Sequence, residues 1–296
     1  MFKTTSSAMR FFQSVGFEGI AWSLRRLHCP VSPEALVLDV GSGGNPYPRA
    51  NVLLDAYEDT VERYNAPIIK DRPMVYGLGE RIPFRDKAFD FVIASHVLEH
   101  TADPNLFLNE LMRVGKAGYI ETPDAFFERI NPFRFHRLEV TDVDGKIIIF
   151  KKPEWRPHGE WVDMYERKVK DSQFLSYLKK HPAPFYMRFY WQDEIDYEIR
   201  NPEIDASWPL LSGITSTHAK TSFSMRLRVK LTKFIRKQFS QTLRNRSIDL
   251  LSLLRCPDCF STMLTQNDST ITCQHCSAKF ISSNGIPVMY PQGKQS

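Results

Sequence analysis

One short stretch of the chain combines the residue types that bind a nucleoside. Residues 36–45 read Leu-Val-Leu-Asp-Val-Gly-Ser-Gly-Gly-Asn, so an apolar run ends in a glycine-rich turn. Glycine permits such a tight turn and lets a ligand lie against the backbone. A second apolar run, residues 51–54, ends at Asp55, whose carboxylate could accept hydrogen bonds from a ribose diol. We therefore expect a nucleoside-cofactor site formed by Asp39, Gly41, Ser42, Gly43 and Asp55.

The spacing in this stretch argues against a dinucleotide cofactor. The dinucleotide fingerprint has a third glycine that packs a helix against the strand, and this chain has Pro46 there. A proline removes an amide that would help to cradle a pyrophosphate. Asp55 also follows Gly41 by only 14 residues, fewer than the roughly 20 that are typical of NAD sites. A nucleoside cofactor without phosphates fits better, and S-adenosylmethionine is the candidate.

Two Cys-x-x-Cys pairs near the carboxyl end form the second chemically capable group. Cys256 and Cys259 are followed, after 13 residues, by Cys273 and Cys276. Four thiolates in this arrangement suit a tetrahedral zinc ion in a closed structural site. A redox dithiol is the alternative for a single pair, and a matched second pair disfavours it. A segment of about 40 residues buries too little apolar surface to fold alone, so zinc would supply folding energy.

The glycine-rich stretch and a second block resemble class I S-adenosylmethionine-dependent methyltransferases of the type 11 group. The block, residues 79–100, reads Gly-Glu-Arg-Ile-Pro-Phe-Arg-Asp-Lys-Ala-Phe-Asp-Phe-Val-Ile-Ala-Ser-His-Val-Leu-Glu-His. In that family the block is an adenine-side loop, a turn and the fourth strand of the sheet. The resemblance covers about residues 30–125 and implies S-adenosylmethionine as the cofactor. It adds these candidates to the cofactor site: Leu78, Gly79, Glu80, Ser95 and His96.

The chain departs from this family at two places. The turn has Asn45 where relatives often carry a third glycine, so the first helix is expected to be short or replaced by a loop. The adenine-side pair, often Asp-Ala in relatives, is Leu78-Gly79, and Glu80 or a backbone amide could contact the adenine amino group instead. The alternative is a decayed, non-catalytic Rossmann-like domain, against which the retained carboxylates Asp39 and Asp55 argue.

Residues 250–291 resemble the small zinc-ribbon activator of eukaryotic tRNA and release-factor methyltransferases. The likeness rests on Leu-Leu-Arg-Cys-Pro at residues 253–257 and on Gly-Ile-Pro-Val at residues 285–288. Activators of this kind dock on a methyltransferase partner and stabilise it. On the present chain the resemblance implies a stabilising module that is built in.

The elements around these residues predict an α/β fold. We expect a Rossmann-like, doubly wound sheet with an added β-rich substrate subdomain and a small C-terminal zinc ribbon. Asp103 and Pro104 predict the start of a helix that ends at Gly115 or Gly118, and residues 119–123 predict the fifth strand. The expected domains are 1–125 for the cofactor-binding core, 126–215 for sheet completion and substrate binding, 216–250 for a basic amphipathic connector, and 251–296 for the ribbon.

The expected substrate region contains hairpin signals and many aromatic side chains. Asp144-Gly145 lies between apolar runs and predicts a type I′ hairpin. A second hairpin is expected around residues 191–194, flanked by 186–190 and 195–199. Core packing is the commoner role of each aromatic residue, but several could stack on a sugar or a base. These are Phe133, Phe135, Trp155, Trp161, Phe189, Tyr190 and Trp191.

A histidine and an arginine follow the expected fifth strand. His136 could act as a general base and Arg137 as an anion clamp. The alternative is an ordinary loop pair. The Tyr-Ile-Glu-Thr-Pro strand and this His-Arg pair are similar to bacterial methyltransferases of surface glycan or lipid biosynthesis.

Positive charge is concentrated in one segment. The formal net charge is +5, yet residues 220–246 carry nine Lys and Arg and no acid, which leaves about −4 for the remainder. An anionic membrane surface or RNA could bind this segment, or it could be a connector whose apolar residues pack on the core. We find no stretch of ~20 apolar residues that would span a membrane and no secretory signal. Thiolate metal ligands indicate a reducing compartment. These observations predict a cytoplasmic protein that could lie peripherally on a membrane.

The sequence therefore predicts an S-adenosylmethionine-dependent methyltransferase with a structural zinc. The expected reaction is O-methylation of a sugar, a lipid-linked glycan or another small acceptor. One alternative is a tRNA or translation-factor methyltransferase, which the ribbon suggests. The other is a non-catalytic, methyltransferase-like scaffold that binds a partner through the ribbon.

Overall fold

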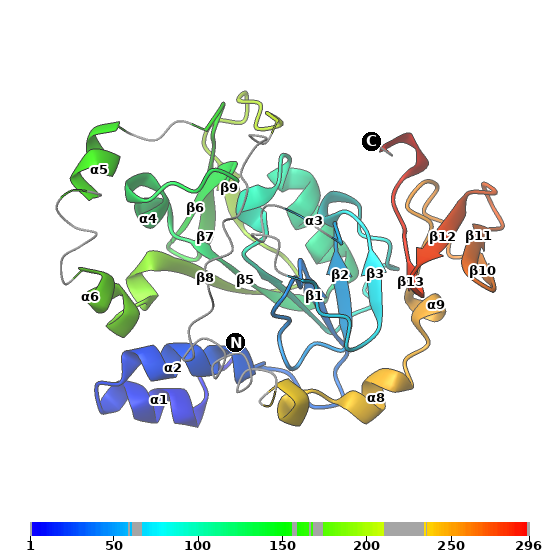
Figure 1. Ribbon diagram of the computed structural model, residues 1–296, viewed down its shortest axis with the longest axis horizontal. Coiled ribbons are helices and arrows are strands. Elements are labelled where there is room, and N and C mark those ends of the chain that lie inside the picture. The colour runs from blue at the N-terminus through cyan, green and yellow to red at the C-terminus, as the bar shows by residue number, and fades with distance from the viewer. Residues whose placement is uncertain are drawn as a thin grey trace. The chain divides into compact units, whose positions relative to one another are not determined.

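The computed structural model describes residues 2–58, 60, 67–155, 159–165, 167, 174–209, 234 and 236–294 (Figure 1). The chain forms two compact units, each assembled from three segments. Unit 1 consists of Met1–Ser32, Ala94–Asn105 and Ala117–Ser212. Unit 2 consists of Pro33–Ile93, Leu106–Lys116 and Gly213–Ser296.

Unit 2 contains the parallel strands that the apolar runs predicted. They are β1 (Val37–Val40), β2 (Val52–Asp55), β3 (Met74–Tyr76) and β4 (Phe91–Ser95), whose last two residues belong to unit 1. Their order is β3-β2-β1-β4, and β1 pairs in parallel with β2, as β2 does with β3. Every residue of β1, β2 and β3 is buried, as expected for parallel strands covered on both faces. This confirms a Rossmann-like α/β fold.

A loop, not a helix, joins β1 to β2. Residues 41–51 contain Pro46 and Pro48, which remove two backbone donors. The Asp39 carboxylate instead accepts a hydrogen bond from the backbone N–H of Tyr47 at 2.7 Å. The expectation of a short or missing first helix is thus confirmed. Helix α3 (Pro104–Val114) begins at the predicted proline and ends just before Gly115.

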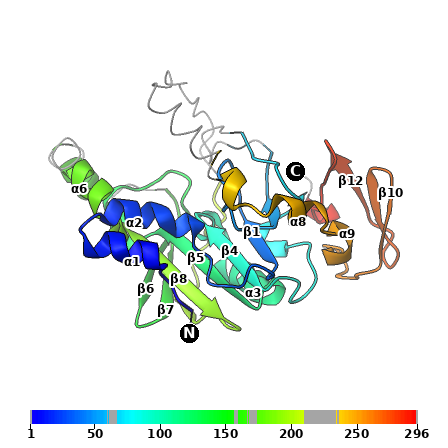
Figure 2. The same cartoon turned by 90° about the horizontal axis from the view of Figure 1, so that it is seen from below.

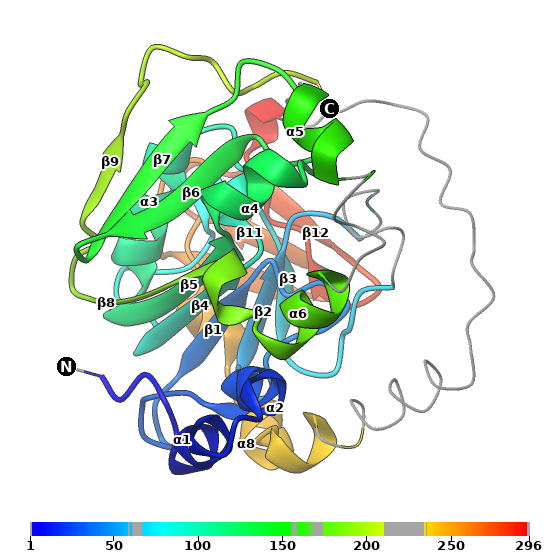
Figure 3. The same ribbon diagram turned by 90° about the vertical axis from the view of Figure 1, so that its left-hand side faces the viewer.

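Unit 1 contains helices and two further groups of strands. The helices are α1 (Ser7–Ser14), α2 (Glu18–Leu24), α4 (Ala125–Ile130), α5 (Gly159–Met164) and α6 (Phe174–Lys180). The strands are β5 (Ala117–Pro123), β6 (Leu138–Val143), β7 (Lys146–Lys151), β8 (Tyr186–Gln192) and β9 (Tyr197–Ile199). Strand β5, the predicted fifth strand, pairs antiparallel with β8, and β6, β7 and β9 form a separate sheet (Figure 3).

One predicted hairpin is confirmed and the other is wrong. Strands β6 and β7 meet at Asp144 and Gly145, whose φ angles of 52° and 79° are those of a type I′ turn. The flanks of residues 191–194 do not pair with each other. Residues 186–192 pair with β5 along its whole length, and β9 pairs in parallel with β7. The long β5 edge offers seven paired positions, which the short return strand cannot match.

The ribbon is an antiparallel sheet at the C-terminal end of unit 2. Helices α8 (Thr242–Arg246) and α9 (Leu250–Leu253) precede it (Figure 2). The strands of the sheet are β10 (Leu264–Asn267), β11 (Thr270–Cys273), β12 (Lys279–Ser283) and β13 (Ile286–Pro287), in that order. The chain then joins the edge of β3, where Val288 bridges Tyr76 in parallel and the Met289 N–H donates to the Tyr76 carbonyl at 2.8 Å. The chain that follows the ribbon is therefore attached to the edge of β3, while the ribbon strands form a sheet of their own.

Two parts of the sequence analysis are not decided by this description. Residues 210–233 and 235, which belong largely to the expected basic connector, are not described. The four domain ranges stay a prediction. Within the described part of the chain, none of the helices is long and apolar enough to cross a membrane.

Candidate functional site

The glycine-rich turn of unit 2 is held by two buried carboxylates. Gly41 and Gly43 adopt φ angles of 68° and 53°, a left-handed conformation that favours glycine. The Gly43 N–H donates to Asp55 Oδ2 at 2.8 Å, and Asp39 holds the far end of the loop at Tyr47. Asp39 and Asp55 are 2% and 6% exposed. The turn and the end of β2 are therefore fixed relative to each other before any ligand binds.

The same turn contains a buried polar atom that a ligand would satisfy. Ser42 is 6% exposed, and its Oγ has no hydrogen-bond partner among the described residues. A buried hydroxyl without a partner is unfavourable, so a polar ligand group at this position would stabilise the turn. The left-handed glycines also leave the backbone without a Cβ on the ligand side. These residues fit the nucleoside end of S-adenosylmethionine.

The expected adenine-side residues lie directly after β3. Leu78 precedes a single helical turn, Gly79–Arg81, and Leu78, Gly79 and Glu80 are all half-buried. The Gly77 N–H donates to the backbone carbonyl of Asp55 at 3.0 Å, which connects this loop to β2. A Cβ at Gly79 would lie 2.7 Å from the Phe107 ring, so a larger residue cannot be placed there without a shift. Parallel strands bring β1, β2 and β3 together at their carboxyl ends, where such sheets bind ligands.

The last two expected cofactor residues, Ser95 and His96, belong to a polar network in unit 1. Ser95 Oγ donates to Glu121 at 3.4 Å. The two ring nitrogens of His96 lie 3.3 Å from Glu99 Oε1 and 3.3 Å from Glu121 Oε1. Burial opposes the charged imidazole, but the hydrogen bonds with Glu121 and Glu99 outweigh burial and raise the pKa of His96 to about 9. The φ of 59° at His96 lies in the left-handed region, which is uncommon for a non-glycine residue.

Glu121 is the centre of this network, and the sequence analysis did not single it out. Arg25 donates to both carboxylate oxygens at 2.7 Å, and the Tyr119 hydroxyl donates to Oε2. Burial raises the pKa of Glu121, but the hydrogen bonds from Arg25 and His96 lower it by more than burial raises it. The pKa of Glu121 is therefore well below its usual value. Arg188 donates to the Tyr119 hydroxyl at 3.0 Å. In the sequence, Glu121 stands out only as a charged residue within the expected strand 119–123.

His136, the expected general base, is paired with a carboxylate. Its Nδ1 lies 2.7 Å from Glu128 Oε2, and Lys152 Nζ lies 2.7 Å from Glu128 Oε1. His136 is 7% exposed, and its ring lies 4.7 Å from that of His100, centroid to centroid. Burial is the main reason why the pKa of His100 is lowered to about 4, which keeps that imidazole neutral.

Arg137 has a structural role in this structure. Its guanidinium donates to the carbonyl of Ala206 at 2.6 Å and to that of Trp208, and it lies over the Trp208 ring at 4.9 Å. These contacts hold the segment that follows β9, and both are made by Nη1 of the guanidinium. The geometry thus favours the interpretation of Arg137 as a loop residue.

Most of the aromatic residues suggested for acceptor stacking are packed in unit 1. Phe135, Phe189 and Trp191 are 4%, 9% and 3% exposed, so they belong to the core. The others have different surroundings: Phe133 stacks on His136 at 4.8 Å, Tyr190 lies 4.6 Å from Tyr119, Trp155 lies under Arg134 at 5.1 Å, and the side chain of Trp161 lies outside the described part. Trp22, which the sequence did not indicate, carries the Arg25 guanidinium at 4.0 Å.

The four ribbon cysteines converge on one point. Their Sγ atoms lie within 4.8 Å of one another, with Cys256 and Cys276 3.6 Å apart and Cys259 and Cys273 3.5 Å apart. None of the four is in a disulfide. A tetrahedral Zn²⁺ with Zn–S bonds of about 2.3 Å places its sulfur ligands about 3.8 Å apart. The observed spacing therefore fits zinc closely.

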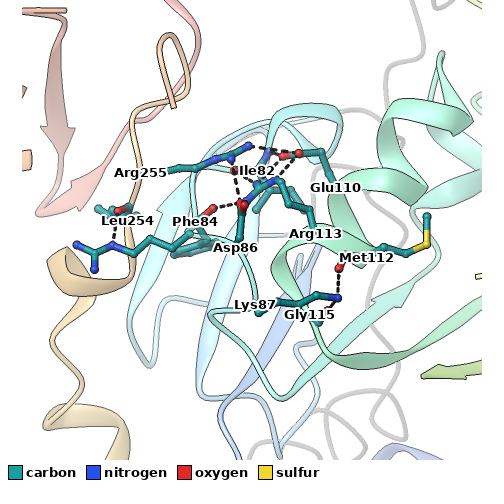
Figure 4. Close-up of polar contacts among 11 residues, drawn as sticks. Ile82, Phe84, Asp86, Lys87, Glu110, Met112, Arg113, Gly115, Leu254 and Arg255 are labelled. Carbon is teal, nitrogen blue, oxygen red and sulfur yellow. Dashed lines mark hydrogen bonds and ion pairs between the residues drawn. The ribbon is translucent and has the colours of Figure 1, made fainter. Parts of the chain in front are cut away.

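A network of charged residues joins the ribbon to the rest of unit 2 (Figure 4). Arg255, one residue before the first cysteine, lies 3.1 Å from Asp86 and 3.4 Å from Glu110. Arg113 also pairs with both carboxylates, at 2.7 Å and 2.6 Å. On the other side, Arg81 donates to the carbonyls of Pro257 and Asp258, within the first cysteine knuckle. Arg81 lies in the expected adenine-side turn, so its hydrogen bonds connect that turn directly to the ribbon.

A comparison with protein families identifies the centre of the chain. Residues 38–120 match the family model described as methyltransferase domain, Methyltransf_11. Residues 38–120 are a methyltransferase domain. Such a domain is typical of S-adenosylmethionine-dependent methyltransferases. The matched span includes every expected cofactor residue.

The solved structures to which the chain is similar are distant. A chain of the Haloferax volcanii complex between the Trm112 methyltransferase activator and a methyltransferase is 16% identical, with a TM-score of 0.37, over 64% of this chain and 95% of that one. A Mesorhizobium loti S-adenosylmethionine-dependent methyltransferase is 12% identical, with a TM-score of 0.35, over 59% and 97%. A Thermotoga maritima methyltransferase is 19% identical, with a TM-score of 0.29, over 40% of this chain and 57% of that one. The comparison with curated proteins gives no match.

The described part of the basic segment divides into anchored and exposed residues. Arg236 pairs with Asp71 at 2.9 Å, and Arg244 donates to the carbonyls of Pro33 and Ala35 near the start of β1. These two cations thus attach the segment to unit 2 of the methyltransferase. Several apolar side chains remain in water: Phe234, Phe239 and Leu243 are 60%, 56% and 84% exposed.

Proposed function

We propose that this methyltransferase methylates a hydroxyl group of a sugar, a lipid-linked glycan or another small acceptor. The observation that carries the hydroxyl class is the 2.7 Å hydrogen bond between His136 Nδ1 and Glu128. A carboxylate oxygen accepts this hydrogen bond, so in the neutral ring Nδ1 carries the proton and Nε2 keeps a lone pair. A hydroxyl must lose its proton to become a good nucleophile, and a histidine oriented by a carboxylate is suited to that task.

The residues of the chain mainly bind and orient. S-adenosylmethionine supplies a methyl group whose leaving group is a neutral thioether, so little further activation of the donor is needed. Gly41, Gly43 and Asp55 hold the nucleoside in this proposal, and alignment provides much of the rate increase. His136 Nε2 accepts the proton of the acceptor hydroxyl. The choice of a sugar or glycan among hydroxyl compounds rests on the sequence similarity of the β5 strand and the His136-Arg137 pair to bacterial glycan and lipid methyltransferases.

Methyl transfer from trideuterated S-adenosylmethionine tests the acceptor class. Nucleotide sugars, lipid-linked glycans, bulk tRNA and a translation factor are incubated with the full chain, and mass spectrometry detects the acceptor that gains the label. The expected acceptor is a sugar hydroxyl. His136→Asn keeps a donor near Nδ1 but lacks Nε2, and it should lower kcat by about 10²–10⁴-fold. His181→Asn is the matched control, because His181 Nδ1 also pairs with a glutamate, Glu18, at 2.8 Å, near the surface.

A tRNA or translation-factor methyltransferase is the second candidate. The ribbon favours this candidate, because it resembles the activator of such enzymes. Arg81 and Arg255 connect the ribbon to the rest of unit 2. Labelling of tRNA or of the factor, without labelling of any sugar, would replace the first proposal by this one. Binding of the cofactor with no transfer to any acceptor would favour the non-catalytic scaffold.

The ribbon cysteines hold one structural zinc in this proposal. The described sulfur atoms fit a tetrahedral site, and His275 between two of them is not needed as a ligand.

Exposed apolar and cationic residues of the basic connector are suited to binding an anionic membrane. The apolar residues are Phe234, Phe239 and Leu243, and the cations are Lys237 and Arg246. RNA is the less favoured partner of this surface, because bare apolar side chains contribute little to phosphate contacts.

A further inference from the structure

Three potential metal ligands meet in the interior of unit 1. Glu99 and His100 lie in a short helical turn, Leu98–His100, directly after β4, and His136 lies between α4 and β6. Each offers one ligand atom, and these three atoms lie within 4.8 Å of one another. Glu99 is 1% exposed and His136 is 7% exposed. The chain thus brings a carboxylate and two imidazoles from two distant segments to one buried point.

The carboxylate of Glu99 is only half satisfied. Its Oε1 lies 3.3 Å from His96 Nδ1, whereas Oε2 is buried and has no hydrogen-bond partner among the described residues. Burying a carboxylate oxygen without a partner is strongly unfavourable. A cation at Oε2 would remove this penalty.

The two histidines are held as metal-ligating histidines usually are. The Nδ1–H of His136 donates to Glu128, which is itself fixed by Lys152 at 2.7 Å and by the Phe133 N–H at 3.0 Å. His100 makes a backbone hydrogen bond with Phe135. Metal-ligating histidines commonly donate the other ring N–H to a carboxylate or a backbone carbonyl, which fixes the tautomer and the ring orientation.

We propose that Glu99 Oε2, His100 and His136 Nε2 bind a divalent first-row transition-metal ion. Two imidazoles and one carboxylate suit Mn²⁺, Fe²⁺, Co²⁺ or Zn²⁺ better than Ca²⁺ or Cu⁺. Three protein ligands leave coordination positions open, and an oxygen of a hydroxyl acceptor can occupy one of them. This assignment of the open position rests on the proposed O-methylation, whereas the metal site does not. With an ion bound, His136 Nε2 would be a ligand, and the ion would lower the pKa of the acceptor hydroxyl; the general-base role proposed for His136 Nε2 applies to the chain without this ion.

Binding of Mn²⁺ to the zinc-loaded full chain tests the site. Mn²⁺ prefers oxygen and imidazole to thiolate ligands, so it does not displace zinc from the four ribbon cysteines. The electron paramagnetic resonance signal of free Mn²⁺ should report one bound equivalent. Glu99→Gln, His100→Gln and His136→Asn should each weaken binding at least tenfold. His181→Asn should leave Mn²⁺ affinity unchanged, because His181 lies outside the cluster and pairs with Glu18.

Thermal unfolding separates a metal ligand from a structural residue. Without Mn²⁺, Glu99→Gln should melt below the wild-type temperature, because the variant loses the charge that pairs with His96. With Mn²⁺, the melting temperature should rise for the wild type and not for Glu99→Gln. The inference is wrong if no Mn²⁺, Co²⁺ or Zn²⁺ binds beyond the ribbon equivalent, or if the three variants bind as tightly as the wild type.

The metal site and the proposed function can fail separately. Mn²⁺ binding is measured without methyl donor or acceptor, so a bound ion together with no labelled acceptor would reject the function alone. Methyl transfer that depends on His136 in a chain that binds no second metal would reject the metal site alone, and His136 would then be the base.

Discussion

Arg25 binds Glu121 through two parallel hydrogen bonds of 2.7 Å each, and the Glu121 side chain is fully buried. Arg25 itself is 10% exposed, so both charges are removed from water. Removing one member of such a pair leaves a buried charge uncompensated. This ion pair links the N-terminal helices to β5. We therefore expect its loss to lower the free energy of unfolding.

Arg25→Gln should lower the free energy of unfolding by about 3–5 kcal/mol at pH 7, measured by urea denaturation. The pKa of Glu121 is held below its usual value of 4.5, so its stabilisation is present above that pH and is lost as the pH falls. The difference between wild type and variant should therefore shrink below about pH 4.5. Arg129→Gln is the control, since Arg129 pairs with Glu139 at 2.7 Å but is 52% exposed, and it should cost about 1 kcal/mol or less. Equal losses in the two variants would contradict this interpretation.

Zinc should be found in the ribbon. A mercurial reagent that titrates thiolates should release about one zinc ion per chain, and Cys256→Ser should abolish this release and lower the melting temperature. Cofactor binding should be only partly reduced. Cys29→Ser is the control, because the fifth cysteine lies outside the cluster and should not change the released zinc. Metal-free protein with a disulfide between Cys256 and Cys259 would overturn the zinc assignment.

Valine at Gly43 should abolish cofactor binding. Gly43 is left-handed and donates its N–H to Asp55, so a branched side chain would strain the turn and fill the space beside it. We expect at least a tenfold loss of S-adenosylhomocysteine affinity by calorimetry. Gly145→Val is matched, because Gly145 is also left-handed, with φ of +79° and open space around it, but lies in the β6–β7 turn. It should lower stability and keep the affinity, whereas similar affinity losses in both variants would indicate a general folding defect.

The exposed apolar residues of the basic connector should mediate membrane binding. Phe239→Ser with Leu243→Ser should reduce pelleting with anionic phosphatidylserine vesicles, since both side chains are more than half exposed. Phe126→Ser is the control, because Phe126 is 59% exposed but lies on α4. Strong tRNA binding that falls steeply with salt, without vesicle binding, would instead support RNA. Arg236 is unsuitable for such tests, because it already pairs with Asp71.

The sequence predicted the local features of the structure and missed those made by distant residues. Buried apolar runs, the Pro104 start of α3 and the Asp144-Gly145 turn are properties of a few neighbouring residues, so their chemistry is visible in the chain. The hairpin expected around residues 191–194 failed because β8 finds its partner in β5 instead of in the residues that follow. Arg25 and Glu121 lie 96 positions apart, and no local pattern connects them.

The candidate sites divide in the same way. The four cysteines and the glycine-rich turn have fixed spacings, and the structure places each group together. His136 was singled out, but Glu128, Glu99 and His100 were not, because their role depends on how α4 and the turn after β4 meet. A carboxylate oxygen that is buried without a hydrogen-bond partner, such as Glu99 Oε2, can be recognised only from the folded chain.

Calorimetric titration of the full chain with S-adenosylhomocysteine tests the central claim most directly. The account predicts one binding site per chain with a micromolar dissociation constant, and no comparable binding of NADH. The turn lacks the third glycine, and Pro46 lacks the amide, that a pyrophosphate would use. Tight binding of NADH, with no binding of S-adenosylhomocysteine or S-adenosylmethionine, would contradict the account.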